Sequence, residues 1–314
     1  MNKEPILTLI IPSYNTSKYV DECVPTYVND NLNGKIKVLF VDDGGNDDTF
    51  ETLKPYKEKY PNLVYLIHKD NGGHGSVINY CVYNLITTKY FKIIDGDDWV
   101  DTNGLVKSVE ELYKIDDDLV LTDYKICNGD KIETIRCSND NAYIDFYTAI
   151  VKTSAYKSKN ILLTEKVFYD DMEFSLNLYK NFENVRILNH IIYCYRLGNS
   201  EQSVSMCSRI KHYDNLLKII DNVIPVLEYI AKQDNNELPL RYFCGCTISR
   251  FIIPFYVCDK NKIRNNILDF YNNVVRKFNL DKYYKESKLY KFIRCFNFRF
   301  IYIKRLIILR KIKN

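Results

Sequence analysis

Compact apolar runs alternate with polar, helix-periodic stretches along the first half of the chain, and this alternation limits the fold more than any other sequence feature. The apolar runs have the length of buried strands and lie at Ile6–Ile11, Ile36–Val41, Leu63–Ile67, Phe91–Ile94 and Leu119–Leu121. The stretches between them resemble helices and lie at Lys18–Asn29, Asp48–Lys59, Ser76–Ile86 and Asn103–Lys114. This repetition predicts an α/β fold with a mainly parallel sheet covered by helices on both faces. Ligands of such sheets bind beyond the carboxyl ends of the strands, so the segments after those ends form the candidate site.

The second half of the chain changes character. A helix is predicted over Phe168–Asn181, and strand-like segments follow at Val185–Leu188 and Ile191–Arg196. From about Met206 the sequence has long helical periodicity with scattered prolines. We therefore expect an α/β domain over residues 1–205 and a helical C-terminal region over residues 206–314.

The charge of the chain is unevenly placed. The net charge is +4, yet residues 288–314 hold nine Lys or Arg and no Asp or Glu, so residues 1–287 carry −5. This basic, aromatic tail is either an interfacial anchor on an anionic membrane surface or a helix packed on the body with its cations reaching outward. At helical spacing its basic positions do not gather on one face, which weakens the anchor interpretation. The sequence contains no apolar stretch of the roughly 20 residues that a membrane-spanning helix needs.

The N-terminus and the cysteines favour a cytoplasmic protein. Met1-Asn2-Lys3-Glu4 leads into the first strand-like run without a signal-peptide pattern. Ten cysteines are scattered without zinc-type spacing, so reduced thiols are expected rather than disulfides or a zinc site. We expect a cytoplasmic location, with peripheral attachment to the inner face of the cell membrane if the tail is an anchor.

An acidic turn, Asp95-Gly96-Asp97-Asp98, directly follows the fourth strand-like run. Carboxylates this close repel one another unless a positive charge lies among them, so a divalent cation is the expected partner. Mg²⁺ and Mn²⁺ take hard oxygen ligands and keep positions open for phosphates, which indicates a phosphorylated ligand. The alternative is a solvated turn that is acidic by chance.

Other candidate residues follow the remaining predicted strands. Tyr14 lies after Pro12 and offers its ring to a flat base, while Asp43 can accept a hydrogen bond from a ring N–H of that base. The glycine-rich loop Asp70–Ser76 leads into a helix and presents backbone N–H groups, which favour negatively charged oxygen. Within it, His74 is either a ligand for phosphate or acceptor, or an ordinary turn histidine. A P-loop NTPase and a dinucleotide dehydrogenase are disfavoured, because neither of their glycine motifs is present.

Taken together, these segments form an ordered set of motifs. They are I-P-x-Y-N, V-D-D-G-x-x-D-x-T, N-G-G-x-G, D-G-D-D and Y-D-D-M-E-F, and they lie in this order within residues 6–205. This set resembles glycosyltransferase family 2. The resemblance implies a GT-A fold, with a nucleotide-binding part at about residues 1–100 and an acceptor-binding part at about residues 101–205. It also implies a nucleotide-sugar donor, a divalent metal (Mn²⁺ or Mg²⁺) and inversion at the anomeric carbon.

The resemblance implies roles for individual residues of the donor site. Tyr14 and Asp43 match the positions that hold the nucleobase, and Asp95 and Asp97 match those that face ribose and metal-diphosphate. The implied metal ligands are Asp97 and Asp98. The complete set implied for nucleotide-sugar binding is Pro12, Tyr14, Asn15, Asp43, Gly73, His74, Asp95, Gly96, Asp97, Arg196 and Gln202.

The implied catalytic base is Asp171, the second acid of the family's acidic pair. Asp170 stands where the family usually has Glu, and its side chain is shorter. This departure from the family pattern affects how the first acid of the pair could orient the second. Taken alone, two acids in the first turn of a helix are explained by its positive N-terminal end.

These implications define the expected function. We expect an inverting, metal-dependent glycosyltransferase that moves one sugar from a UDP-linked donor to a saccharide or lipid-linked acceptor in cell-surface glycan synthesis. No nucleic-acid partner is expected, and the Q-x-x-R-W signature of processive synthases is missing. The alternatives are a sugar nucleotidyltransferase, which usually has a basic glycine-rich loop after the first strand, and an inactive glycan-assembly scaffold.

Overall fold

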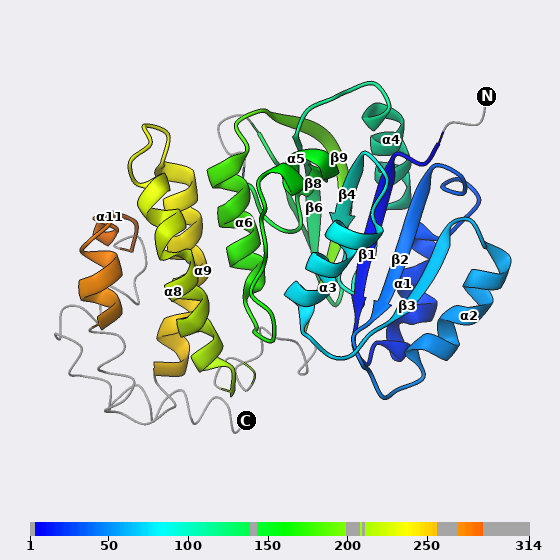
Figure 1. The fold of residues 1–314 in the computed structure, drawn as a ribbon, viewed down its shortest axis with the longest axis horizontal. Coiled ribbons are helices and arrows are strands. Elements are labelled where there is room, and N and C mark those ends of the chain that lie inside the picture. The colour runs from blue at the N-terminus through cyan, green and yellow to red at the C-terminus, as the bar shows by residue number, and fades with distance from the viewer. Residues whose placement is uncertain (1–3, 139–142, 199–207, 209–210, 256–268, 285–314) are drawn as a thin grey trace. The chain divides into compact units, whose positions relative to one another are not determined.

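The computed structural model describes residues 4–138, 143–198, 208, 211–255 and 269–284 (Figure 1). The chain divides into two compact units, Met1–Asn199 and Ser200–Asn314. The first unit is α/β, as predicted, and holds the candidate site.

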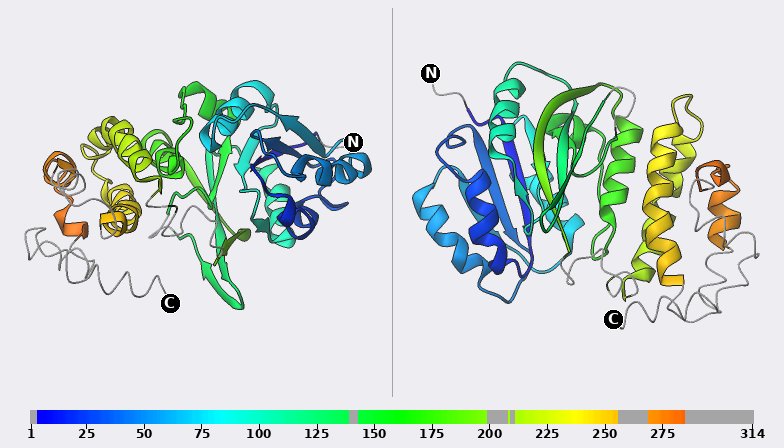
Figure 2. Two further views of the ribbon diagram at one scale, coloured as in Figure 1. Left: turned by 90° about the horizontal axis from the view of Figure 1, so that it is seen from below. Right: turned by 180° about the vertical axis from the view of Figure 1, so that it is seen from behind.

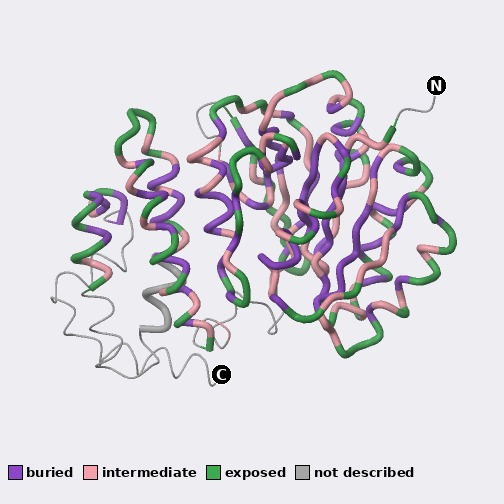
Figure 3. The backbone as a smooth tube through the Cα atoms, viewed as in Figure 1, coloured by how far each residue is buried: buried purple, intermediate pink, exposed green. Residues whose placement is uncertain are grey.

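One half of the sheet is parallel and contains the first four predicted strands. These strands are β1 (Leu7–Ser13), β2 (Ile36–Asp42), β3 (Val64–His68) and β4 (Tyr90–Ile93), in the spatial order β3-β2-β1-β4. The register pairs Leu7 with Ile36 on one side and with Tyr90 on the other. Because β1 is covered on both faces, its first five residues are all buried instead of alternating (Figure 3).

The other half of the sheet is mixed. β8 (Ala149–Lys152) pairs antiparallel with both β4 and β6 (Leu119–Asn128), while β9 (Val185–Leu197) runs parallel to β6. Two short strands, β5 (Trp99–Val100) and β7 (Lys131–Ile135), pair antiparallel with β9 and β6. The two strand-like segments predicted at 185–196 are in fact the single strand β9, whose register with β6 shifts near Asp123.

Helices cover both faces of this sheet (Figures 1 and 2). One face carries α1 (Val20–Tyr27) and α4 (Thr102–Leu112), and α2 (Thr49–Lys59) packs beside α1. The short 3-10 turn η1 (Ser17–Tyr19) precedes α1. On the other face lies α3 (His74–Tyr80), which continues into the π-helical turn η2 (Cys81–Leu85) beside α5 (Thr153–Ser158). The helix predicted at Phe168–Asn181 is α6 (Asp170–Asn181). It begins two residues later than predicted, because Tyr169 adopts a left-handed conformation with φ 76°.

The second unit is helical in its described part, in line with the predicted helical C-terminal region. It contains α8 (Tyr213–Ile230), α9 (Glu237–Phe255), the π-helical turn η3 (Tyr271–Val275) and the short α11 (Asp281–Tyr284). α9 and α11 are joined by a 2.5 Å hydrogen bond between the hydroxyl groups of Thr247 and Tyr284. Among the described helices, none has both the length and the apolar character required to span a membrane. The basic tail at 288–314 lies outside the described residues.

Lys92 of β4 is an unusual core residue, since its side chain is only 1% exposed. Its Nζ donates hydrogen bonds to the carbonyl oxygens of Tyr147 (2.8 Å) and Ala149 (3.2 Å), which fastens β4 to the start of β8. Burial lowers the pKa of the Lys92 ammonium from 10.5 to about 7. The unfolded chain therefore binds one more proton than the folded chain between pH 7 and 10.5.

We expect Lys92→Met to remove a pH dependence of stability. In the native protein the cost of burying the ammonium is complete below pH 7, and it is relieved as the pH rises towards 10.5. Relative to Lys92→Met, the free energy of unfolding of the native protein should rise by up to about 1.4 kcal/mol per pH unit in this window. Urea titrations between pH 6.5 and 9.5 test this: Lys92→Met should lose this contribution to the slope, and the exposed Lys107→Met should keep it. Equal slopes in Lys92→Met and the native chain would contradict it.

Candidate active site

The predicted site segments meet at one edge of the sheet because β1, β2 and β4 are parallel neighbours. The acidic turn (Asp95–Asp98) packs directly on the end of β1. A Cβ atom on Gly96 would lie 2.8 Å from the carbonyl oxygen of Pro12 and 3.0 Å from Cγ2 of Thr16. Glycine at position 96 therefore lets the acidic turn approach the first strand closely.

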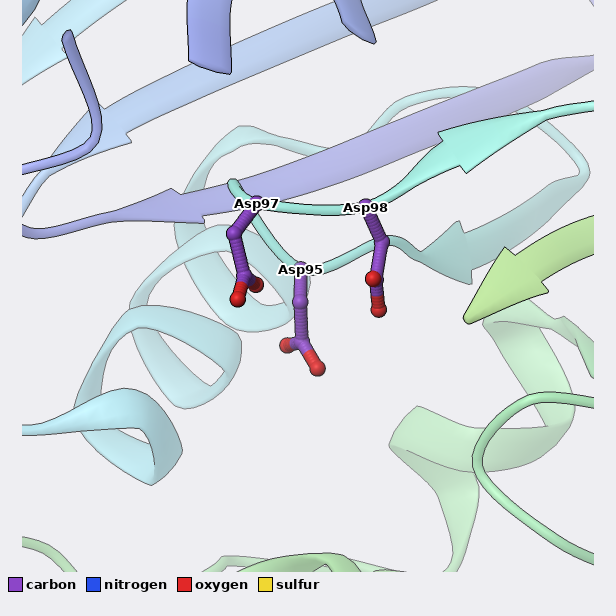
Figure 4. Close-up of side chains that lie close together, drawn as sticks. All are labelled: Asp95, Asp97 and Asp98. Carbon is purple, nitrogen blue, oxygen red and sulfur yellow. The ribbon is translucent and has the colours of Figure 1, made fainter. Parts of the chain in front are cut away.

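The acidic turn gathers three carboxylates on one side of the backbone (Figure 4). Asp95, Asp97 and Asp98 each offer an oxygen atom, and these oxygens lie within 4.8 Å of one another. Asp98 is 1% exposed, and burial together with the charges of Asp97 and Asp95 raises its pKa well above the ordinary value. Clustered, repelling hard-oxygen donors fit a divalent cation such as Mg²⁺ or Mn²⁺, with Asp97 and Asp98 as the predicted ligands.

Strand β9 fixes the acidic turn from the other side. Asp98 accepts hydrogen bonds from the Tyr193 hydroxyl (2.6 Å) and from the backbone N–H of Arg196 (2.7 Å). The Tyr193 hydroxyl in turn accepts a hydrogen bond from the backbone N–H of Asp95 (3.1 Å). One tyrosine thus holds the carboxylate of Asp98 and the backbone of Asp95.

The side chain of Arg196 also holds the acidic turn. Its Nε donates to the carbonyl oxygen of Asp97 (2.8 Å), and its terminal nitrogen lies 3.0 Å from a Glu22 carboxylate oxygen. The guanidinium lies over the rings of Trp99 (4.6 Å) and Tyr19 (5.2 Å). These contacts link the turn to α1, and the role of Arg196 in nucleotide-sugar binding remains a prediction. Gln202, predicted beside it, lies outside the described residues.

Asp43 has partners within the protein. Its carboxylate accepts hydrogen bonds from the backbone N–H groups of Gly72 (2.9 Å) and Gly73 (2.7 Å) and from Nζ of Lys69 (2.7 Å). The negative oxygen expected for the glycine-rich loop is therefore supplied here by Asp43. Gly73 has φ 83°, a conformation that favours glycine.

The other residues predicted for the base lie at the end of β1. Tyr14 is 55% exposed, so its ring is accessible to a ligand. Asn15 has a left-handed backbone with φ 56°, and its side-chain oxygen accepts the backbone N–H of Asn46 (2.8 Å). Asn15 thus shapes the loop after β2.

His74 connects the acidic turn with the first turn of α6. Its Nδ1 is hydrogen-bonded to Oδ2 of Asp170 (2.7 Å), and its Nε2 lies 3.3 Å from Oδ1 of Asp95, as an ion pair without hydrogen-bond geometry. The imidazole packs on the ring of Phe146, with 5.4 Å between the ring centroids. Burial alone lowers the pKa of His74, but the carboxylates of Asp170 and Asp95 outweigh it and raise that pKa well above the ordinary value.

Asp171 lies in the first turn of α6, which His74 links to the acidic turn. It follows Asp170 and is partly exposed. The rings of Tyr147 and Tyr195 stack at 4.7 Å, and burial is the main cause that raises the pKa of both hydroxyl groups. Because His74 contacts both Asp170 and Asp95, the start of α6 lies beside the acidic turn.

Sequence reasoning missed two tyrosines of this site, Tyr147 and Tyr193. With 27 tyrosines in the chain, a tyrosine by itself carries no positional signal.

An acidic D-x-D turn at the carboxyl edge of a sheet, beside acids at the start of a helix, is the arrangement of a GT-A glycosyltransferase.

Comparison with known proteins identifies the family. Residues 8–185 match glycosyl transferase family 2, and the chain therefore belongs to that family of transferase enzymes. This confirms the resemblance seen in the motifs. The glycosyltransferase EpsJ of Bacillus subtilis is 23% identical over 213 residues, and this match spans 61% of each protein, which is less than two thirds of that relative.

Solved structures confirm the GT-A fold. S. aureus TarS 1–349 in complex with UDP-GlcNAc matches with a TM-score of 0.64 at 17% identity, over 91% of each chain. The mannosyltransferase PcManGT from Pyrobaculum calidifontis, in complex with GDP-Man and Mn²⁺, matches with a TM-score of 0.53 at 14% identity, over 94% of this chain and 88% of that one.

Proposed function

We propose that this protein transfers one sugar from a UDP-linked donor to a hydroxyl group of a saccharide or lipid-linked acceptor, with inversion at the anomeric carbon. The observation that supports the proposal is the convergence of three carboxylates at the edge of the sheet, beside the first turn of α6, which holds Asp171 and is linked to the acidic turn by His74. Cell-surface glycan synthesis, the divalent metal and a cytoplasmic location are parts of this proposal. Attachment to the inner face of the membrane rests on the composition of residues 288–314 alone.

The proposed reaction is a single displacement. Asp171 accepts the proton of the acceptor hydroxyl. At the same time, the oxygen of that hydroxyl forms a bond to the anomeric carbon of the donor sugar. The bond from that carbon to the diphosphate oxygen breaks, and its electron pair leaves with UDP. Asp97 and Asp98 would hold a divalent cation, which neutralises charge on the departing diphosphate when it is bound. Tyr193 and Arg196 keep the acidic turn in place through the contacts described above.

The choice of uridine follows the structural comparison and the base site. TarS, the solved structure with the higher TM-score of the two described, binds UDP-GlcNAc, whereas PcManGT binds GDP-Man. In this chain, Tyr14 presents an exposed ring directly after Ser13, whose carbonyl oxygen accepts the backbone N–H of Asp43 (2.9 Å).

Donor binding tests the proposal. With Mn²⁺ and UDP at about 100 times its Kd, the melting temperature should rise by roughly 5–10 °C, because a ligand stabilises the state that binds it. GDP should give a smaller shift. Tyr14→Ala should weaken UDP binding by about tenfold through lost stacking, whereas Tyr229→Ala, which removes a ring that is 43% exposed in the other unit, should not. No shift with any nucleoside diphosphate would overturn the proposed function, and a larger shift with GDP would overturn the choice of base.

A further inference from the structure

We propose that His74 is a positioning residue, which holds Asp170 and thereby sets the place of the neighbouring Asp171 relative to the acidic turn. This inference rests on the proposed function, since it assigns the support of the proposed base. The imidazole joins three separate segments: it opens α3, bonds Asp170 in the first turn of α6 at 2.7 Å, and lies 3.3 Å from Asp95 after β4.

The imidazole is itself held rigidly. The preceding residue, Gly73, donates its N–H to Asp43, and the carbonyl of Gly72 accepts a hydrogen bond from the backbone N–H of Lys166 (2.7 Å). On the other side, the ring of Phe146 packs against the imidazole. A group fixed by its backbone and by packing can transmit a defined position to the residue that it bonds.

Asp170 is the natural recipient of this support. It is 4% exposed, so its carboxylate needs a partner in the interior, and the Nδ1 of His74 meets it. The Asp170 side chain is one carbon shorter than the Glu usual in the family. In this protein the His74 imidazole, which comes from the start of α3, approaches the Asp170 carboxylate to within hydrogen-bonding distance.

Two contacts of the described residues hold the first turn of α6 from different sides, and the contact of Asp170 leads towards the acidic turn. Glu173 accepts hydrogen bonds from the backbone N–H (2.7 Å) and hydroxyl (3.0 Å) of Thr164, which tie the helix to the segment before it. The bond of Asp170 ties the same turn to His74, which faces Asp95. Loss of the imidazole should therefore leave α6 formed while freeing Asp171 to shift relative to the anomeric carbon.

Three substitutions at this position separate the two contacts of the imidazole. An Asn amide reaches roughly where Nδ1 lies and can still donate to Asp170, whereas a Gln amide reaches roughly where Nε2 lies and keeps a polar group beside Asp95. His74→Ala keeps neither contact. His190→Ala is the matched control, because His190 forms a comparable pair with Glu111 (2.6 Å) outside the site.

The measurements are kcat for transfer, KM for the nucleotide sugar, the Kd of UDP with Mn²⁺ and the melting temperature. We expect His74→Ala and His74→Gln to lower kcat by about 10- to 100-fold, with KM and Kd within about threefold of the native values. His74→Asn should recover kcat to within about fivefold of the native enzyme. In His74→Ala, a further Asp170→Asn change should add little to the loss in kcat, since both remove the same contact.

The outcomes separate this inference from the proposed function. No transfer or donor hydrolysis by the native enzyme overturns both. An active native enzyme overturns the inference alone in any of three cases: if His74→Ala keeps kcat, if KM rises with kcat unchanged, or if Gln recovers activity better than Asn. The second and third results would instead assign His74 to the donor.

Discussion

Asp171→Asn is expected to lower the turnover of sugar transfer by about 10²–10⁴-fold, the usual contribution of a positioned general base. The amide keeps the size of the carboxylate but cannot accept the proton of the acceptor hydroxyl. Binding of UDP should stay within about threefold of the native value, because none of the residues predicted to bind the donor lies on α6. Initial rates at saturating donor, together with calorimetric titration of UDP, measure the two quantities separately.

Asp130→Asn is the control for this change, because Asp130 is an exposed acid in the turn between β6 and β7. Both variants should unfold at the native temperature, and only Asp171→Asn should lose turnover. Near-native turnover in Asp171→Asn would remove this residue from the role of base. A loss of UDP affinity that matched the loss of turnover would assign Asp171 to the donor site instead.

Strands β1, β2 and β4 could be predicted because burial on both faces of the sheet requires a continuous apolar run in each of them, and β3 because it has a similar run although it is mostly half-buried. The missed strands lack that signal. All of β7 except Ile135 is exposed, β5 has two residues, and β8 consists of four residues between turns. Their pairing is set by neighbours distant in the sequence, such as β4 for β8. The polar pair Asn189 and His190 interrupts the apolar pattern of β9, which is why one strand was predicted as two.

The site shows the same division between local and long-range information. The acids after β2 and β4 could be placed at one edge because parallel strands bring their carboxyl ends together. The partners of those acids could not be predicted. Nothing local indicates that Asp43 would bond the glycine-rich loop 29 and 30 residues later, or that His74 would meet Asp170 across 96 residues. Such contacts depend on packing between separate elements, and they decide which acids remain available for a ligand.

Removal of divalent cations is expected to stop transfer, with a fall of at least about 100-fold that added Mn²⁺ or Mg²⁺ reverses. The reason is electrostatic. A diphosphate anion has to approach a turn where three carboxylate oxygens lie within 4.8 Å of one another, and like charges repel at this distance. A divalent cation changes the sign of this local interaction. Assays with EDTA-treated enzyme and defined additions of metal measure the effect.

Direct binding separates a requirement of the acidic turn from a general effect of salt. Calorimetric titration of Mn²⁺ should detect a site in the native protein that is lost in Asp97→Asn, while the exposed Asp130→Asn retains it. UDP affinity should depend on Mn²⁺ in the native protein and in Asp130→Asn but not in Asp97→Asn, because only that change removes a predicted ligand. Full transfer activity after complete chelation would contradict the metal assignment. The positive charge near the diphosphate would then have to come from the protein, and Arg196 and His74 are two residues that contact the turn.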